Sequence, residues 1–401
     1  MKKAFCFAVI LSLLVGIFFS GCQKVTDDVL TPSPVERNDV NELAKKGKGG
    51  DIRVPADYTT IQEAVDAAVS GEVIAVSPGT YVEQVSIIDK DIHLVGAEGA
   101  IIEAPSSMSV SVSNYYAIIY VNQANVTFSG FKVDGKGLGN SHYRFVGVFY
   151  YNAGGRIDRC EVIDVRDTPF SGRQHGLAIY AYNNEEGIQE IFITNNKVTD
   201  FQKNGITING NWPHDYYSAN PAIATYSNIK AHVNNNEVTG AGPSDVIAQN
   251  CIQFGRGASG EIKNNVIKYS AYTGEGWAAT GILGYYPYTV MVQRNNVYDC
   301  DPPVYFSASP SCKIINNEFI SVDLSEADPW GVLISGTDNI VTNNTFTDFY
   351  VGVYIGSSYY GDTYNTKAVT NRFYNVDYPV IESDVGLVDG TKERATKIYN
   401  D

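Results

Sequence analysis

A short motif of one polar and one apolar position recurs through the C-terminal half of the chain. An Asn is followed two residues later by Val, Ile, Tyr or Phe, and successive copies lie 21 to 40 residues apart. A motif that returns at this irregular spacing is typical of a solenoid whose insertions lie in loops. The pattern therefore predicts one repeat domain. The copies are Asn196/Val198, Asn236/Val238, Asn265/Ile267, Asn296/Tyr298, Asn317/Phe319, Asn344/Phe346 and Asn371/Phe373.

Short apolar segments, most of them opening on Gly, lie between these motifs. Alternation along a strand points their second and fourth residues inward, so that each coil has at least two strands. Roughly eleven parallel coils at about 4.8 Å spacing give a shaft about 50 Å long. The motif Asn is expected to be structural, because Asn tolerates left-handed turns and can hydrogen-bond the next coil. Examples are Gly147-Val148, Gly176-Leu177-Ala178-Ile179, Gly205-Ile206-Thr207-Ile208 and Gly331-Val332-Leu333-Ile334.

One amphipathic helix is predicted near the start of the repeats, with Thr59 or Thr60 as its N-cap and Gly71 ending it. A solenoid exposes its terminal core unless something covers it, so this helix is expected to form the N-terminal cap. Its apolar residues fall at helical spacing at Ile61, Ala64, Val65, Ala68 and Val69.

The segment around this helix resembles a known family. Tyr-Thr-Thr-Ile-Gln-Glu-Ala-Val-Asp-Ala-Ala at 58–68, Pro-Gly-Thr-Tyr-Val-Glu at 78–83 and Leu-Val-Gly at 94–96 are similar to the opening of pectin methylesterases and other proteins of the pectin-lyase-like superfamily. The resemblance covers residues 54–100 and implies a fold, not a reaction. The fold class we predict is an all-β, single-stranded right-handed parallel β-helix (solenoid) with a short N-terminal capping helix.

The N-terminus has the parts of a secretory signal. Lys2 and Lys3 precede an apolar run that is too short to span a membrane comfortably. The next residues, Phe-Ser-Gly-Cys22, resemble the bacterial lipobox, whose cysteine is lipidated, although Phe replaces the usual Leu; a plain signal peptide is the alternative. We expect residues 1–21 to be a lipoprotein-type signal peptide, residues 22–50 a flexible tether and residues 51–401 the β-helix domain. The protein is then extracytoplasmic, in the periplasm, on the cell surface or secreted.

The net charge limits the classes of partner, and the cysteines allow disulfide bonds. The formal net charge is −15, and removing residues 1–21, which contain two Lys and no acid, makes it −17. This balance disfavours nucleic acid and anionic membranes, so the membrane is expected to be touched only through a lipid on Cys22. We expect a monomer that binds polysaccharide. Four cysteines of the domain allow three disulfide pairings in an oxidising compartment, and Cys160 stands at a motif position where it is expected to be buried: Cys160, Cys251, Cys300 and Cys312.

Polar and aromatic residues that are not part of the repeat pattern gather on the central coils. We take these residues as the candidate site. Five arginines within thirty residues are expected to offset the acidic field there: Arg144, Arg156, Arg159, Arg166 and Arg173. The candidate catalytic residues are Lys203, His175, His214, Arg173, Asp215 and Tyr216. The candidate substrate-binding residues are Arg144, Gln174, Trp212, Tyr217, Gln253, Arg256, Trp277, Tyr285 and Tyr286.

These residue types suit the cleavage of a uronate polymer by β-elimination. That reaction needs a base for the C5 proton, a cation that stabilises the carboxylate as the enolate forms, and an acid for the leaving oxygen. Lys203, His175 or His214 could be the base, Arg173 or Arg144 the carboxylate partner, and Tyr216 or Tyr217 the acid. The Tyr and Trp residues of the loops are expected to stack on sugar rings.

Other activities remain open on the same fold. Glycoside hydrolysis needs two carboxylic acids, for which Asp215 with Asp167 or Glu275 are candidates. Pro213-His214-Asp215 is similar to part of a run in mannuronan C-5-epimerases, with Trp212 where the first Asp would stand. The motifs of the methylesterases are missing, which argues against that activity. Calcium could bind exposed acids such as Asp299 and Asp301, but no spacing selects a metal. A non-catalytic glycan-binding or adhesive lipoprotein is the competing class.

Overall fold

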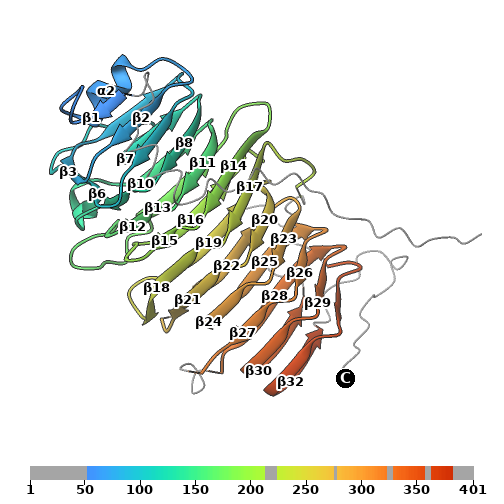
Figure 1. Ribbon diagram of the computed structural model, residues 1–401. Coiled ribbons are helices and arrows are strands. Elements are labelled where there is room, and N and C mark those ends of the chain that lie inside the picture. The colour runs from blue at the N-terminus through green and yellow to red at the C-terminus, as the bar shows by residue number, and fades with distance from the viewer. Residues whose placement is uncertain (1–51, 213–223, 275–277, 323–327, 357–362, 383–401) are drawn as a thin grey trace, which may run out of the picture. The chain divides into compact units, whose positions relative to one another are not determined.

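The structure is a computed structural model that describes residues 52–212, 224–274, 278–322, 328–356 and 363–382. Its strands are parallel and follow one another in coils, so that each strand pairs with its counterpart one coil away (Figure 1). The predicted all-β parallel β-helix is therefore confirmed.

Each central coil contributes three strands, one more than the predicted minimum. The first sheet contains twelve described strands: β1 (Ile52–Val54), β2 (Val73–Val76), β5 (His93–Gly96), β8 (Asn125–Ser129), β11 (Gly154–Asp158), β14 (Gln189–Thr194), β17 (Ile229–Asn234), β20 (Ser259–Lys263), β23 (Val290–Gln293), β26 (Lys313–Ile315), β29 (Ile340–Thr342) and β31 (Lys367–Val369).

The other strands form two ladders, which the long strands β30 and β32 join into one sheet. The second ladder contains β3 (Gly79–Val82), β6 (Ala100–Glu103), β9 (Lys132–Asp134), β12 (Glu161–Ile163), β15 (Lys197–Val198), β18 (Glu237–Ser244), β21 (Val266–Tyr272), β24 (Asn296–Cys300), β27 (Glu318–Ile320), β30 (Thr345–Ile355) and β32 (Arg372–Glu382). The third ladder contains β4 (Val85–Ile88), β7 (Tyr116–Asn122), β10 (Phe145–Tyr151), β13 (Leu177–Tyr182), β16 (Asn204–Asn209), β19 (Asn250–Gly255), β22 (Thr280–Tyr285), β25 (Val304–Pro310), β28 (Trp330–Thr337) and parts of β30 and β32. A short 3-10 helix, η1 (Leu138–Ser141), precedes β10.

The core lies inside the coils and is built from columns of like residues. Ile179, Ile206, Ile252 and Ile282 lie side by side on successive strands of the third ladder, and all four are fully buried. Each such side chain contributes roughly 1.5 to 3 kcal/mol by leaving water. The predicted inward direction is confirmed for these four residues.

An asparagine ladder follows the corner between the first sheet and the second ladder. Asn265 shows the pattern: its Nδ2 donates to the Val233 carbonyl at 2.8 Å and to Oδ1 of the next Asn at 2.9 Å, and its Oδ1 accepts the backbone N–H of the preceding Asn at 2.8 Å. The members are Asn196, Asn236, Asn265, Asn295, Asn317, Asn344 and Asn371.

The predicted register of this ladder is wrong at one coil. Asn295, not Asn296, is the buried member, and Asn296 opens β24. The left-handed conformation also belongs to the residue before the ladder position, as at Asn264 (φ 54°) and Arg294 (φ 54°). Two adjacent residues therefore have different roles. The first adopts the left-handed turn, and the second, the ladder Asn, forms the hydrogen bonds between coils.

Cys160 continues the same corner at the N-terminal side. Its backbone N–H donates to Oδ1 of Asn196 at 2.9 Å, and its thiol is buried, which raises its pKa to about 12. The prediction of a buried cysteine at a ladder position is confirmed. Cys160, Cys251, Cys300 and Cys312 are all free thiols, so none of the three possible pairings is formed.

Helix α2 (Ile61–Ala67) lies at the N-terminal end of the coils (Figure 1). Thr60 caps it and forms a capping box with Glu63, while Ile61, Ala64 and Val65 are buried in the core cluster. The predicted cap is thus confirmed, but Ala68, and not Gly71, is the C-cap. No described helix is long and apolar enough to cross a membrane.

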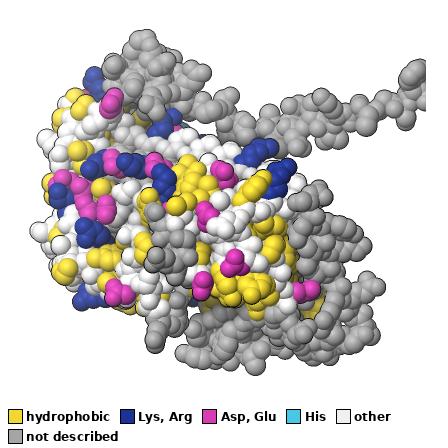
Figure 2. Space-filling model, turned by 90° about the horizontal axis from the view of Figure 1, so that it is seen from below, with side chains coloured by type: hydrophobic (Ala, Val, Ile, Leu, Met, Phe, Trp, Pro, Cys, Tyr) yellow, Lys and Arg dark blue, Asp and Glu magenta, His cyan; other side chains and the backbone are white. Residues whose placement is uncertain are grey.

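The arginines predicted to form one basic field lie on different faces. Arg159 pairs with Asp158 at 2.9 Å, Arg166 pairs with Asp164 at 3.3 Å, and Arg156 stacks on Phe192 of the first sheet. On the face shown in Figure 2, basic and acidic side chains are interspersed. The prediction of a local basic field made by all five is therefore wrong.

Candidate active site

The third ladder brings the predicted site residues together in a register that differs from the expected one. Gly147, Ala178 and Gly205 occupy the same position on adjacent strands, because Val148, Ile179 and Ile206 pair directly. The predicted alignment of Gly176 with Gly205 is wrong, since Leu177 pairs with Asn204. Leu177 points outward and packs against an external aromatic cluster.

The corrected register makes Arg144, His175 and Gln202 equivalent, each three residues before this shared position. All three lie where a connection from the second ladder enters the third ladder. His175 therefore lies between Arg144 and Gln202 on adjacent coils, and Arg173 lies two residues earlier in its connection.

A buried hydrogen-bond network holds the connection between β12 and β13. The Asp167 carboxylate is fully buried and accepts a hydrogen bond from the hydroxyl of Ser171. The backbone N–H of Asp167 donates to Oε1 of Gln202 at 3.1 Å. Gln202 in turn donates to Ser171 from Nε2. These hydrogen bonds between buried groups hold the residues that follow Asp167 in place.

His175 is the chemically unusual member of this group. Its side chain is 4% exposed, and its ring lies edge-on to that of Tyr143 with centroids 4.9 Å apart. Neither ring nitrogen has a hydrogen-bond partner in the part of the chain that the structure describes, and neither does Oδ1 of Asp167. Burial lowers the pKa of His175; Asp167 opposes this shift, while Arg173 and Arg144 add to it. The imidazole is therefore neutral at pH 7.

Two guanidinium groups flank this imidazole. Arg173 has a 53% exposed side chain, with its Nε 3.9 Å from the Asp167 carboxylate and its Nη1 donating to the Asn140 carbonyl at 3.4 Å. Arg144 lies over the rings of Tyr115 and Tyr143, 4.9 Å and 5.8 Å from their centroids. Gln174 is exposed and donates to the Gly172 carbonyl at 3.2 Å. Two cationic side chains therefore act on an imidazole whose ring nitrogens have no hydrogen-bond partner in the described ranges.

Lys203 lies on the next coil, and its backbone N–H donates to the Gly176 carbonyl at 2.9 Å. Its amine donates to the Ala248 carbonyl, and burial lowers its pKa to about 8. Lys203 is thus adjacent to the His175 connection through the backbone, while its amine is bonded toward the following coil.

A family model described as "right handed beta helix region" matches residues 220–387. A mannuronic acid specific polysaccharide family 6 lyase from the human gut microbiota has a similar structure, with a TM-score of 0.51 and 12% identity over 84% of this chain and 78% of that chain. A surface adhesin of Streptococcus pneumoniae has a TM-score of 0.52 and 13% identity over 87% of this chain and 92% of that chain. The protein has the fold of a right-handed parallel β-helix. A search of curated sequences finds no match.

The outer face of this β-helix carries a polar network next to the His175 group. Oε1 of Gln253 accepts from Asn204 at 3.0 Å, its Nε2 donates to Asn209 at 3.4 Å, and Asn250 donates to Asn204 at 3.0 Å. Of these residues only Gln253 is among the candidates from the sequence. For Asn204 and Asn209 the signal is an Asn where the preceding coil has Leu or Tyr. Asn250 pairs with Asn204 and repeats this position one coil later.

The remaining candidates lie at the opposite end of the same strands. The exposed Arg256 accepts the Trp212 N–H through its backbone carbonyl at 3.1 Å, and it opposes the rise in the pKa of Tyr182 that burial causes. Tyr285 is half-buried beside Tyr286, with centroids 4.8 Å apart. Tyr286 is fully buried, so the prediction that it contacts sugar is wrong. The candidates thus form two groups, one at each end of β13, β16, β19 and β22.

Several predicted site residues lie outside the described residues: His214, Asp215, Tyr216, Tyr217, Glu275, Trp277 and Cys22. Within the described ranges, no group of three or more His, Cys, Asp or Glu side chains could hold a metal ion. Asp299 is buried and Asp301 half-buried, so neither is the exposed acid expected of a calcium ligand. Burial raises the pKa of Asp301.

Proposed function

We propose that this β-helix is an extracytoplasmic enzyme that cleaves an acidic or pectin-like polysaccharide by β-elimination, with His175 as the base. The observation that supports it most is the neutral, unpaired imidazole between two arginines. A base must be deprotonated to accept a proton, and a cation must lie close by to stabilise the carboxylate of the uronate.

The proposed step uses the residues of this corner as follows. A ring nitrogen of His175 takes the C5 proton of the uronate, the C5–H electron pair forms the C4–C5 double bond, and the C4–O4 bond breaks. The leaving oxygen takes a proton from solvent or from an acid of the 213–223 segment, where Tyr216 and Tyr217 stay candidates. Arg173 and Arg144 bind the carboxylate and stabilise its enolate form. Lys203 is the alternative base, although its amine is already bonded to the Ala248 carbonyl.

Non-catalytic glycan binding is the second candidate function, and the burial of His175 favours it. An imidazole that is 4% exposed must be uncovered before a polymer reaches it. The arginines and the Gln253 network would then bind an acidic glycan without chemistry. Hydrolysis and epimerisation on the same substrate stay alternatives, because the acid Asp215 lies outside the described residues.

One assay separates these functions. The protein is incubated with polygalacturonate, alginate and other uronate polymers, and unsaturated products are followed by ultraviolet absorbance together with reducing ends. We expect both signals, and His175→Ala should lower turnover at least a hundredfold, in line with the loss of a general base. His93→Ala is the matched control, because His93 is exposed on the outer face of the first sheet. Binding on affinity gels without either product would overturn the enzyme in favour of the binder.

The N-terminal organisation is part of the same proposal. We infer that residues 1–21 are a lipoprotein-type signal peptide, that Cys22 is lipidated, and that residues 22–50 tether the 51–401 domain outside the cytoplasm. Metabolic labelling with an alkyne fatty acid tests it: label is expected on the wild-type protein and not on Cys22→Ala. Label on neither would leave a plain signal peptide as the alternative.

A further inference from the structure

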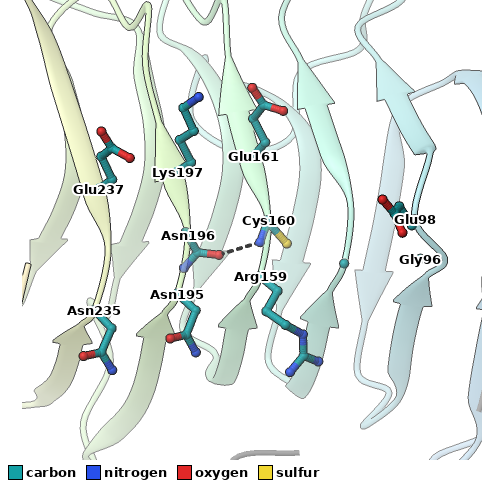
Figure 3. Close-up of a pocket in the computed structure, with 11 residues that line it drawn as sticks. Gly96, Glu98, Arg159, Cys160, Glu161, Asn195, Asn196, Lys197, Asn235 and Glu237 are labelled. Carbon is teal, nitrogen blue, oxygen red and sulfur yellow. Dashed lines mark hydrogen bonds between the residues drawn. The ribbon is translucent and has the colours of Figure 1, made fainter. Parts of the chain in front are cut away.

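A groove of about 580 Å³ runs over the corner between the first sheet and the second ladder, away from the third-ladder residues of the candidate active site. Five successive coils contribute to it (Figure 3). This volume is in the range of small-molecule sites, and the groove is elongated across the coils. Its described lining consists of Gly96, Glu98, Gly130, Arg159, Cys160, Glu161, Asn195, Asn196, Lys197, Asn235 and Glu237.

The shape of the groove follows from the corner itself. Figure 3 shows two rows of side chains that point to opposite sides, with Cys160 and Asn196 between them. One row belongs to the second ladder, and the other belongs to the turn. At the N-terminal end the turn positions are Gly96 and Gly130, which have no side chain. Gly130 has φ +81°, and a Cβ there would clash with the Gly96 carbonyl. This end of the groove is therefore kept open by the backbone.

The wall on the second ladder alternates in charge. Glu161, Lys197 and Glu237 occupy matching backbone positions on the neighbouring strands β12, β15 and β18. Neighbouring strands of a sheet lie about 4.8 Å apart. Glu237 bonds Lys268 at 3.1 Å. For Glu161 and Lys197, by contrast, no hydrogen bond or ion pair connects the side chain to any other group of the described chain. Neighbouring opposite charges that do not pair with each other remain available to a ligand.

The chemistry of the lining selects the class of ligand. Few of the lining side chains are apolar and none is aromatic, so a lipid or an aromatic ligand has little to pack against. Arg159 is engaged with Asp158, and three carboxylates face two cations, so a polyanion is disfavoured. Carboxylates, amides and an ammonium group together offer the acceptors and donors that hydroxyl groups need. The coil spacing is close to the length of one sugar residue.

We propose that this groove binds an extended, uncharged polysaccharide lying along the axis of the β-helix. Glu161 and Glu237 accept hydrogen bonds from sugar hydroxyls, Lys197 donates to them, and Asn195 and Asn235 serve the opposite side. The site is independent of the proposed lyase, which takes an acidic chain at the third ladder. The protein would thereby hold a neutral glycan and act on an acidic one.

The test titrates the protein calorimetrically with neutral hexasaccharides of glucan, xylan, mannan and galactan, and with an oligogalacturonate. We expect at least one neutral ligand to bind, with an affinity that changes less than twofold between low and high salt, because no ligand charge is screened. The double variant Glu161→Ala/Lys197→Ala should weaken this binding at least tenfold. Glu318→Ala is the matched control: Glu318 is exposed on β27 of the same ladder, outside the groove, and its variant should bind like the wild type.

Three outcomes would overturn the proposal: no binding of any neutral ligand, binding that survives in the double variant, or binding of the oligogalacturonate alone. His175→Ala separates this site from the proposed active site, because it should leave neutral binding unchanged whether or not the protein is a lyase. The far-ultraviolet circular dichroism of each variant shows that the coils remain folded.

Discussion

The backbone N–H of Cys160 donates to Oδ1 of Asn196 at 2.9 Å, so that a cysteine fills the corner position that asparagine fills in the later coils. Asn196 in turn donates to the Ile157 carbonyl and to Asn236, both at 3.0 Å. The ladder therefore does not require asparagine at its terminal position, because there only a backbone donor is needed.

Inside the ladder the side chain is essential for stability. Asn265→Ala removes the acceptor of the Asn236 N–H and Nδ2 and the two bonds that the Asn265 amide donates, and it leaves the buried Asn236 N–H without this partner. We expect a loss of about 3 kcal/mol, since each unsatisfied buried group costs roughly 1 to 3 kcal/mol. Asn296→Ala, at the position where the sequence placed the ladder, should cost less than about 1 kcal/mol. Urea unfolding followed by Tyr and Trp fluorescence compares the two variants, and equal losses would contradict the corrected register.

Cys160 is expected to accept the residue type of its neighbours. In Cys160→Asn the new amide can donate to Oδ1 of Asn196 and to the Phe128 carbonyl, which the thiol already faces at 3.9 Å. The free energy of unfolding should change by less than about 1 kcal/mol. Cys251→Asn is the comparison, because Cys251 is equally buried but lies in the third ladder, away from the corner. There an unsatisfied amide should cost about 2 to 3 kcal/mol. A larger loss in Cys160→Asn than in Cys251→Asn would contradict this assignment.

Acid should weaken the outer face of the first sheet. Hydrogen bonds from His232, above all, and from Lys263 and Asn234 lower the pKa of Glu261 to about 2 from its ordinary 4.5. A carboxylate with a depressed pKa in the folded state stabilises fully above pH 4.5, and this contribution is lost as the pH falls toward 2. Glu261→Gln should therefore cost about 1 to 2 kcal/mol at pH 6, allowing for solvent screening, and much less at pH 2.5. Urea midpoints at both pH values measure it, with Glu318→Gln as the exposed control. A pH-independent difference would refute the role of the charge.

The fold can be predicted from the sequence because the same short motif recurs in every coil. The site depends on which residues of neighbouring coils lie side by side, and the recurring motif does not determine that register. Asn-Asn doublets mark the corner, but two adjacent Asn residues cannot show which one turns and which one bonds; at 294–296 the turning residue is an Arg, and the prediction shifts by one. Gly176 similarly resembles the Gly that opens other strands. It lies in the connection, however, two residues before Ala178, which is the residue equivalent to Gly205. The buried Gln202 network and the groove at Lys197 are formed by residues of different coils, so no short sequence pattern predicts them.

Lys203 should make stability rise in mild alkali. Burial lowers its pKa to about 8 from 10.5, so the folded state binds its proton less tightly than the unfolded state does. The penalty is therefore full below pH 8 and is relieved as the pH rises from 8 to 10.5. Lys203→Met should stabilise the protein at pH 7 by up to about 3 kcal/mol, less the value of the lost bond to the Ala248 carbonyl. Lys313→Met, on the exposed Lys313, should leave the dependence on pH unchanged. Urea midpoints between pH 7 and 10 test it, and an unchanged slope in Lys203→Met would contradict it.

The pH dependence of cleavage should identify the base. A base works only when deprotonated, so the rate falls as the pH drops through its pKa. Burial places the pKa of His175 below its usual 6.5, whereas that of Lys203 is about 8. With His175 as the base, kcat/KM changes little between pH 8 and 7, and its fall in acid is centred below pH 6.5. Lys203→Met keeps this profile, and His175→Ala removes the activity. A profile that instead rises steeply between pH 7 and 9, and disappears in Lys203→Met, would transfer the role of base to Lys203.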